Sequence, residues 1–352
     1  MAKMIAFRLD ANSSVATGHM YRCISIAKQC RKKGYECIFL LAEDECTEIL
    51  RNAGFEYCVL NLKWDDWNYG IDIVKKCLQE KGAKCLVVDS YRVTEQFFSS
   101  LHKEVPIFYL DDLCEKKYDL DAVLHYSEWE DEQIIANLYR NTDVRVYSGM
   151  KYMPLRENFA VSPFETEKKY QFLITTGGSD TYHITRKLLV AMLQDTRLKE
   201  EKICAVLGKM NLDSEEIRML CNEHKNVTVL QNISNMDEVM RQSVFAVTAG
   251  GTSVYELMAS GVPFVCFGFS DDQKYFGLRL ENHGNASWAG DARDDADAVV
   301  QKIMQEFKSM LQLSAEGIQK VIQGNRRLID GCGAERVCNI IIELFKEKDK
   351  NV

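Results

Sequence analysis

FRLDANSSVATGHMYRCISIAKQC, residues Phe7–Cys30, reads as the end of a strand, a turn and the start of a helix. The mostly apolar run Met4–Arg8 predicts the strand, and Thr17, Gly18 and His19 occupy the turn where the helix begins. A helix N-terminus presents unpaired backbone N–H groups and a partial positive charge to an anion. A histidine at such a rim can accept a proton from water near neutral pH. His19 is therefore either a general base or an ordinary polar residue of the first helical turn.

The length and composition are those of a globular protein with two domains. The chain has 352 residues, more than one core of ordinary size accommodates, and 46% of them are apolar. The formal net charge is −8, and the basic cluster Arg31–Lys33 reads as a solvated helix end. We therefore expect no nucleic-acid partner, and the oligomeric state stays open.

The sequence predicts neither membrane insertion nor a metal site. No apolar run approaches the roughly 18–20 residues that span a bilayer. The chain begins with a strand rather than a signal peptide, which predicts a cytoplasmic protein. The 13 cysteines are scattered through apolar patterns, without a C-x-x-C pair or zinc-site spacing. They read as buried, reduced thiols, and we expect no metal and no cofactor.

Short apolar strands alternate with helical patterns through the first half of the chain. Helices are expected at 44–53 and 71–81, where they end at Gly54 and Gly82. Strands are expected at 36–41, 57–60, 85–89, 106–110 and 120–124. Such alternation implies a parallel, doubly wound sheet with right-handed crossovers.

The alternation fades at residues 148–169, which hold two of the four prolines, and then restarts. In the second half, strands are expected at 170–175, 202–207, 227–230, 244–248 and 263–267, and helices at 184–193, 236–242 and 254–260. From residue 295 onward the pattern is mostly helical.

These patterns predict an α/β protein with two Rossmann-type domains that face each other across a cleft. The expected N-terminal domain covers residues 1–150 and carries the His19 loop. A linker at 151–169 leads to a C-terminal domain at 170–352. The C-terminal helices either belong to this second domain or pack back on the first.

Three glycine-bearing turns follow predicted strands. The first contains Gly18, the second Gly177, Gly178 and Ser179, and the third Gly250, Gly251, Thr252 and Ser253. Small residues let the backbone approach a phosphate, and hydroxyls add hydrogen-bond donors. None of the turns matches the dinucleotide fingerprint or the P-loop. Glycine at one such turn is usually structural, but two in one domain favour a diphosphate site.

Polar residues after two strands of the second domain are candidates for nucleoside and sugar binding. Glu256 lies in the first turn of the helix after the third glycine turn, where it either caps that helix or accepts hydrogen bonds from a ribose. Asp272 and Gln273 follow the next strand, where they either cap a helix or contact a sugar. A carboxylate beside a phosphate favours a nucleotide over a bare anion.

The segment Val247–Gln273, VTAGGTSVYELMASGVPFVCFGFSDDQ, resembles the nucleotide-sugar domain of the MurG-like GT-B glycosyltransferases. The first loop quoted above, VVDSY, YMPLRENF, TTGGSD and TAGGTSVYE are similar, in order, to the motifs of the PseG/SpsG family. This resemblance covers roughly Met4–Trp288. The family is typified by UDP-2,4-diacetamido-2,4,6-trideoxy-β-L-altropyranose hydrolase, an enzyme of pseudaminic acid biosynthesis.

The resemblance implies a GT-B-like fold and a metal-independent hydrolase that releases UDP by cleaving the anomeric C–O bond with inversion. It implies that His19, after Gly18, is the catalytic histidine, and that Tyr91 is the active-site tyrosine. It further implies roles in substrate binding. Gly251, Thr252 and Ser253 would face the diphosphate, Glu256 the ribose, the backbone around Ile233 the uracil, and Gln273 the sugar.

The implied chemistry agrees with the residues. UDP is a good leaving group once helix N-termini hold its charge, so the remaining requirement is an activated water. His19 can accept that water's proton. Tyr91 either orients the water or a sugar substituent, or forms part of the wall.

Two other functions remain open. A GT-B glycosyltransferase would use the same donor with an acceptor hydroxyl in place of water. A lipid-linked acceptor is disfavoured because the sequence shows no apolar or basic membrane-facing patch. A non-catalytic sensor of nucleotide sugars would bind UDP-sugars without turnover.

Overall fold

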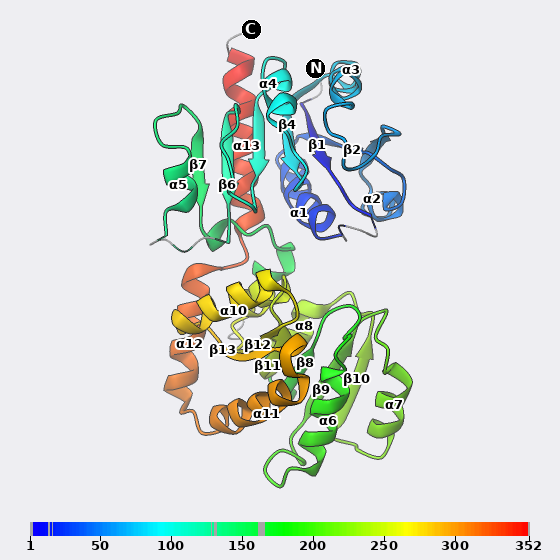
Figure 1. Ribbon diagram of the computed structural model, residues 1–352, viewed down its shortest axis with the longest axis vertical. Helices are drawn as coiled ribbons and strands as arrows, with labels where there is room; N and C mark the ends of the chain where they lie inside the picture. The colour runs from blue at the N-terminus through cyan, green and yellow to red at the C-terminus, as the bar shows by residue number, and fades with distance from the viewer. Residues whose placement is uncertain are drawn as a thin grey trace. The chain divides into compact units, whose positions relative to one another are not determined.

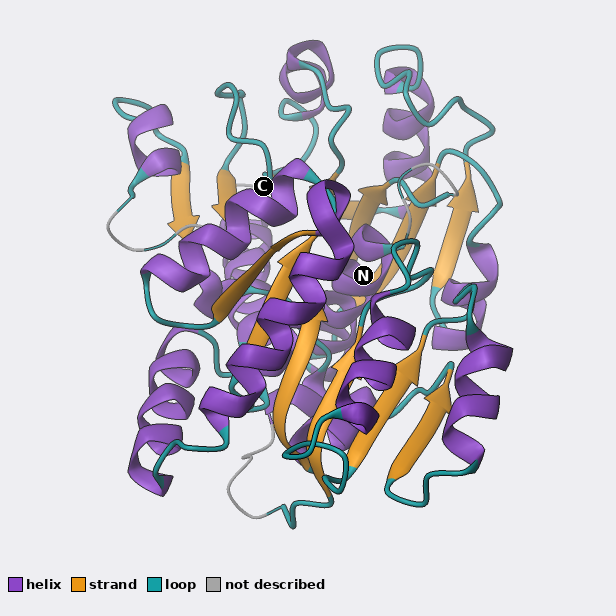
Figure 2. Cartoon of the chain, turned by 60° about the horizontal axis from the view of Figure 1, so that its bottom comes forward, coloured by secondary structure: helices purple, strands orange, loops and turns teal. Residues whose placement is uncertain are grey.

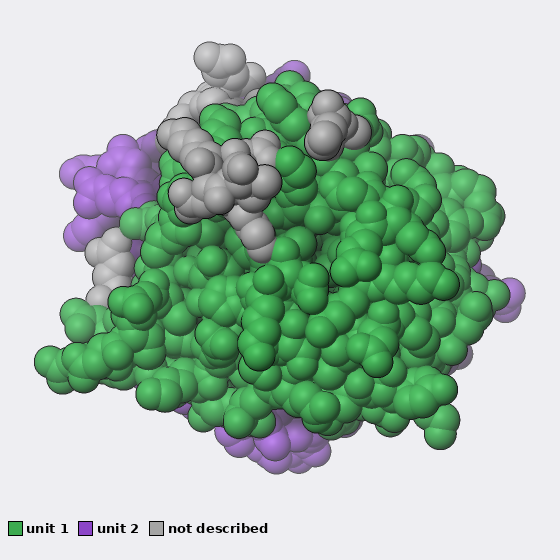
Figure 3. Space-filling model, turned by 90° about the horizontal axis from the view of Figure 1, so that it is seen from above, with its two compact units in different colours: residues 1–157, 331–352 green, residues 158–330 purple. Residues whose placement is uncertain are grey.

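The computed structural model describes residues 3–12, 15, 17–127, 129, 132–160 and 166–350, with only the backbone described for 348–350. The chain forms two compact units (Figures 1 and 3). Unit 1 comprises Met1–Glu157 and Gly331–Val352, and unit 2 comprises Asn158–Asp330. Residues 161–165 of the expected linker lie outside the described residues.

Unit 1 is built on a sheet of seven parallel strands in the order β3-β2-β1-β4-β5-β6-β7. The strands are β1 Met4–Leu9, β2 Glu36–Leu41, β3 Glu56–Val59, β4 Ala83–Asp89, β5 Ile107–Leu110, β6 Ala122–His125 and β7 Arg145–Ser148. The central strands are buried along nearly their whole length, as expected for a parallel sheet covered on both faces.

Helices connect these strands except between β5 and β6, and Figure 2 shows helices packed over parallel strands. They are α1 Gly18–Lys32, α2 Thr47–Ala53, α3 Ile71–Lys81, α4 Glu95–Leu101 and α5 Ile134–Leu138, followed by the 3-10 helices η1 Met150–Tyr152 and η2 Glu157–Ala160. The predicted ends of α2 and α3, before Gly54 and Gly82, are confirmed. The last helix, α13 Gly333–Lys350, contacts α1, β4 and η1, so the end of the chain completes unit 1.

Unit 2 has a sheet of six parallel strands in the order β10-β9-β8-β11-β12-β13. The strands are β8 Tyr170–Thr175, β9 Ile203–Leu207, β10 Val227–Gln231, β11 Ser243–Ala249, β12 Phe264–Gly268 and β13 Ser287–Asp291. The helices are α6 Ile184–Gln194, α7 Ser214–Asn222, α8 Met236–Arg241, α9 Ser253–Ala259, α10 Asp271–Asn282, α11 Ala292–Met310 and α12 Ala315–Leu328.

The predicted architecture of two Rossmann-type α/β domains is confirmed. Two edge strands, β7 and β13, were not predicted, because each is short and only partly buried. All 13 cysteines lie in the described part of the chain as free thiols, most of them buried. Within that part, no helix is long and apolar enough to cross a membrane.

Candidate active site

Four loops bring polar side chains to the carboxyl edge of the unit 1 sheet. They follow β1, β4, β5 and β6, four strands that are neighbours in the sheet. In open α/β sheets, ligands bind at this edge. The loops and the first turns of α1 carry His19, Arg22, Asp89, Tyr91, Asp112 and Tyr126.

His19 and Asp89 form a buried pair. The Nδ1 atom of His19 lies 2.6 Å from Oδ1 of Asp89, and the two side chains are 4% and 0% exposed. Because an ionised carboxylate only accepts hydrogen bonds, Nδ1–H donates to Asp89. Nε2, which has no hydrogen-bond partner among the described residues, is then the nitrogen that can take a proton. This arrangement is typical of a histidine that acts as a general base, with a carboxylate that orients its ring.

Arg22 lies one helical turn after His19 and ties three loops together. Its Nε donates to Oδ2 of Asp89 at 2.6 Å, and its Nη2 donates to Oδ1 of the same carboxylate. Its Nη1 donates to Oδ2 of Asp112 at 2.8 Å and to the hydroxyl of Tyr126. The guanidinium thus binds Asp89 through two nitrogens and fixes the loops after β4, β5 and β6 around one charge.

The charge of Asp89 is set by these contacts. Burial alone would raise the pKa of its carboxyl, but the positive charge of Arg22 and the hydrogen bonds from Arg22 and His19 outweigh burial. They hold the pKa of Asp89 below its ordinary value, so this carboxylate stays ionised at neutral pH. An ionised Asp89 keeps the proton of neutral His19 on Nδ1 and leaves Nε2 as the acceptor.

Tyr91 lies beside His19 and is open to solvent. The two ring centroids are 4.6 Å apart, with the rings at 75°, and Tyr91 is 45% exposed. Partial burial and the negative charge of the nearby Asp112 raise the pKa of Tyr91. The phenol therefore remains protonated at neutral pH and can donate a hydrogen bond to a ligand, but it is unsuited to act as a base.

A second buried network fixes the backbone around Tyr91. Oδ2 of Asp10 accepts hydrogen bonds from Ser90 Oγ at 2.7 Å and from the indole N–H of Trp67 at 3.1 Å. Oδ1 of Asp10 accepts from Arg8 at 2.7 Å. Ser90 Oγ in turn accepts from the backbone N–H of Arg92 at 3.0 Å. The loop that carries Tyr91 is thus held to the end of β1.

In unit 2, the turns after β8 and β11 lie at the ends of neighbouring strands. Asp180, 6% exposed, accepts hydrogen bonds from the backbone N–H groups of Ile184 and Thr185, both at 2.9 Å, and so caps α6. This cap fixes the turn that holds Gly177, Gly178 and Ser179. Figure 1 shows β8, β9, β11 and β12 side by side in this sheet.

The turn after β11 also meets the start of α10. A Cβ atom on Gly250 would lie 3.1 Å from both Cβ and the carbonyl oxygen of Gln273, so glycine permits this approach. The side-chain oxygen of Gln273 accepts a hydrogen bond from the backbone N–H of Phe269 at 3.2 Å. Gly251, Thr252, Ser253 and Glu256 at the start of α9 therefore share one sheet edge with Asp272 and Gln273.

Ile233 is the most distant of the predicted binding residues in unit 2. It follows β10, which is separated from β11 by β9 and β8. The residues predicted to bind the diphosphate and the sugar therefore follow the adjacent strands β8, β11 and β12. Ile233, predicted to meet the uracil, lies at the same edge of the sheet but farther from them.

Gly208, which follows β9, provides a test of the turn after β8. A Cβ atom on Gly208 would lie 2.2 Å from the carbonyl oxygen of Gly178 and 2.4 Å from that of Gly177. We expect Gly208→Ala to displace this turn, to lower the free energy of unfolding by about 1–3 kcal/mol and to weaken UDP binding. Urea unfolding and calorimetric titration with UDP measure the two effects.

Gly324→Ala in α12 is the matched control, because no described atom lies within 4 Å of the added Cβ. It is expected to keep UDP affinity and to raise stability by up to about 1 kcal/mol. Wild-type UDP affinity in Gly208→Ala would contradict a role of the turn after β8 in binding.

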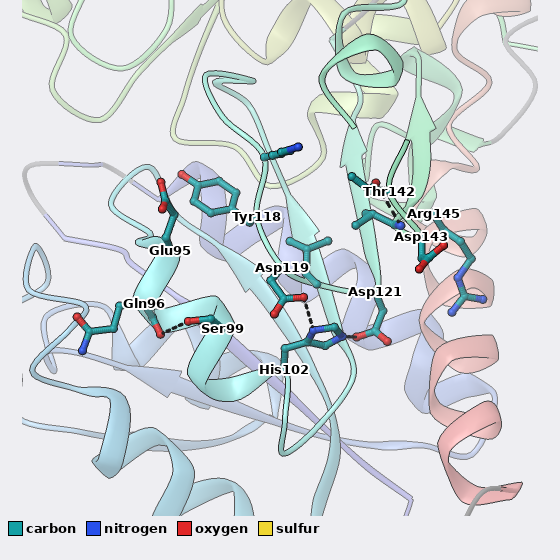
Figure 4. A pocket seen from close by; sticks show the side chains of 13 residues that line it. Glu95, Gln96, Ser99, His102, Tyr118, Asp119, Asp121, Thr142, Asp143 and Arg145 are labelled. Carbon is teal, nitrogen blue, oxygen red and sulfur yellow. Dashed lines mark hydrogen bonds and ion pairs between the residues drawn. The ribbon is translucent and has the colours of Figure 1, made fainter. Parts of the chain in front are cut away.

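One cavity lies elsewhere, at the amino ends of β6 and β7 (Figure 4). It has a volume of about 690 Å³ and contains none of the predicted site residues. His102 lies on its wall, 2.9 Å from Asp119 and 3.1 Å from Asp121. Ligands of open α/β sheets bind at the opposite edge, so we assign the chemistry to the His19 site. Among the described residues, no cluster of three or more His, Cys, Asp or Glu side chains is arranged to hold a metal ion.

Residues 172–330 match the glycosyltransferase family 28 C-terminal domain. Over the whole chain, the fold is similar to that of MurG from Acinetobacter baumannii, with a TM-score of 0.69, 12% identity and coverage of 97% of this chain and 99% of MurG. The GT-B-like fold implied by the sequence is therefore confirmed.

Two curated relatives confirm the resemblance to the PseG/SpsG family. The spore coat polysaccharide biosynthesis protein SpsG of Bacillus subtilis is 26% identical over 222 residues, which cover 61% of this chain and 63% of SpsG. The UDP-2,4-diacetamido-2,4,6-trideoxy-beta-L-altropyranose hydrolase of Campylobacter jejuni is 22% identical over 271 residues, which cover 75% of this chain and 91% of the hydrolase. The alignment thus spans less than two thirds of SpsG.

Proposed function

We propose that this protein is a nucleotide-sugar hydrolase that releases UDP from a UDP-diacetamido-trideoxy sugar in a surface-glycan pathway such as pseudaminic acid biosynthesis. The observation that carries the proposal is the buried pair of His19 and Asp89, with Nε2 of His19 available to accept a proton beside the exposed ring of Tyr91. The substrate class is supported by the activity for which the Campylobacter relative is named, and the glycan pathway by the name of the Bacillus relative.

In this proposal unit 2 binds the nucleotide. Backbone N–H groups and hydroxyls at Gly177–Ser179 and Gly251–Ser253 donate hydrogen bonds to the diphosphate and stabilise its negative charge. Glu256 accepts hydrogen bonds from the ribose, the backbone at Ile233 meets the uracil, and Asp272 and Gln273 contact the sugar. The match of residues 172–330 to a glycosyltransferase domain supports this assignment.

The reaction is a displacement at the anomeric carbon. Water attacks the carbon from the face opposite the diphosphate, the bond from that carbon to the phosphate oxygen breaks, and UDP leaves with the bonding electrons. Nε2 of His19 takes the proton of the attacking water, and the configuration inverts. Tyr91 donates a hydrogen bond to the water or to a sugar substituent. No step of this displacement requires a metal ion.

A glycosyltransferase is the alternative, favoured by the family 28 domain and the likeness to MurG. In that case His19 takes the proton of an acceptor hydroxyl. An NMR time course of UDP-diacetamido-trideoxy sugars with chelator and without acceptor separates the two functions. We expect release of UDP and a free sugar of inverted configuration. Release only after an acceptor is added would establish the transferase instead.

The role of Glu256 can be tested by comparing UDP with 2′,3′-dideoxy-UDP. Wild-type protein is expected to bind UDP more tightly by at least about tenfold, because a charge-assisted hydrogen bond contributes about 1.5–3 kcal/mol. Glu256→Ala should bind both ligands with similar, weaker affinity. If the variant still prefers UDP as strongly as the wild type does, Glu256 does not contact the ribose.

A further inference from the structure

We propose that a small cavity beside Tyr91 in unit 1 is a subsite for an acetamido substituent of the substrate. The cavity has a volume of about 230 Å³ and lies between the loops after β4 and β5. It is lined by Tyr91, Arg92, Asp111, Glu115, Lys116 and Tyr118, among others. Sites for whole small molecules usually measure about 300–1,000 Å³. This cavity therefore fits one part of a sugar nucleotide.

Asp111, which lines this cavity, has a buried carboxylate oxygen without a hydrogen-bond partner among the described residues. Its side chain is buried, with 1% exposed. Oδ1 accepts hydrogen bonds from the backbone N–H groups of Leu113 at 3.0 Å and Cys114 at 2.9 Å. Oδ2 has no hydrogen-bond partner among the described residues. Folded proteins seldom leave a buried acceptor unpaired, so Oδ2 is available to a donor from a bound ligand or a water.

The other walls of the cavity match the rest of an acetamido group. Such a group carries one N–H donor, one carbonyl acceptor and a methyl. The N–H would donate to Asp111, the carbonyl would accept from the cation of Arg92 or Lys116, and the methyl would pack on an aromatic ring. Lys116 Nζ already lies 5.6 Å from the ring centre of Tyr118, so a cation and an aromatic face occur together here. A hydroxyl could donate to Asp111, but it has no carbonyl to reach a cation farther along the wall and no methyl to pack on a ring.

The cavity is also next to the proposed base. Tyr91 lines the cavity and contacts the ring of His19, with the centroids 4.6 Å apart. An acetamido group held against Asp111 would therefore position its sugar ring toward His19. The assignment of this ligand to a sugar nucleotide rests on the proposed function, whereas the unpaired acceptor in the cavity does not.

The test measures binding of a UDP-diacetamido-trideoxy sugar and of two analogues, each with one acetamido group replaced by hydroxyl. Calorimetry uses the full chain carrying His19→Ala, so that turnover does not interfere. One of the two replacements is expected to weaken binding by about tenfold or more, as expected for loss of a hydrogen bond to a charged group. Adding Asp111→Asn keeps an oxygen for the two backbone N–H groups and turns the unpaired acceptor into a donor. This change should abolish the preference and leave the affinity for UDP unchanged.

Asp119→Asn, at the opposite edge of the same sheet, is the matched control and should keep the preference. Lys116→Met on the cavity wall should reduce the preference for the sugar with both acetamido groups. This variant replaces Asp111→Asn in the test if the Asp111→Asn protein does not fold. Equal affinity of the His19→Ala protein for all three sugars would overturn the subsite, as would an undiminished preference in the Asp111→Asn protein. Retained preference without UDP release by the wild-type protein would overturn only the proposed reaction.

Discussion

His19→Ala is expected to lower the rate of UDP release by about 10²–10⁴-fold, the usual contribution of a general base. The substitution removes the imidazole that pairs with Asp89 and packs against the ring of Tyr91. The loss should appear in kcat, because in our proposal His19 contacts the attacking water and the residues proposed to bind UDP lie in unit 2. Single-turnover assays with saturating substrate measure this directly.

The variant is expected to remain folded. Asp89 keeps its contacts with Arg22 and the thiol of Cys23, so removing the imidazole does not leave the carboxylate without partners. His102→Ala is the matched control, because His102 also pairs with aspartates in unit 1 but lies at the other sheet edge. It should keep wild-type turnover. Wild-type turnover in a folded His19→Ala protein would refute the role of His19 as base.

Asp89→Asn is expected to damage both stability and catalysis. Asp89 is fully buried and accepts two hydrogen bonds from Arg22, so its neutral replacement leaves that guanidinium compensated by Asp112 alone. Breaking one partner of a buried ion pair costs about 3–5 kcal/mol in free energy of unfolding. Turnover should fall as well, because asparagine no longer fixes the tautomer of His19. Urea unfolding and steady-state kinetics measure the two losses.

The stability loss should depend on pH. The pKa of Asp89 is lowered in the folded protein, so its contribution to stability is fully present above the ordinary aspartate value of about 4. As the pH falls below that value, the wild-type protein loses this contribution and the variant does not. The difference in unfolding free energy between the two proteins should therefore shrink from pH 7 toward pH 3. A difference that stays constant over this range would contradict an ionised Asp89.

Much of the fold was predictable because its central strands are continuous apolar runs between glycine-ended helices. The predicted strands at 36–41 and 170–175 coincide with β2 and β8, and the ends of the other predicted strands lie within two residues of the observed ones. The edge strand β7 was missed because its sequence, Arg145–Ser148, has no apolar run. A helical pattern in the sequence also does not show which domain the helix packs against. The last helix, α13, therefore could not be assigned from the sequence, and the structure places it in unit 1.

The site was only partly predictable. The turn before His19 indicated a helix N-terminus, but Asp89 lies 70 residues away, and one sequence does not show which carboxylate meets the imidazole. Arg22 is not among the predicted site residues. A local signal for it exists, because Arg22 lies three residues after His19 and residues three apart share one face of a helix. The unpaired oxygen of Asp111 depends on the packing of the loop after β5, and no sequence pattern indicates it.

The most direct test of the account is hydrolysis of a UDP-diacetamido-trideoxy sugar in ¹⁸O-labelled water with chelator and no acceptor. The account predicts release of UDP, with the label in the anomeric hydroxyl of the sugar at early times and none in the phosphates. Mass spectrometry of UDP and of the sugar trapped by reduction distinguishes the two positions. Label in the phosphate of UDP, or no UDP release until an acceptor is added, would contradict attack of water at the anomeric carbon.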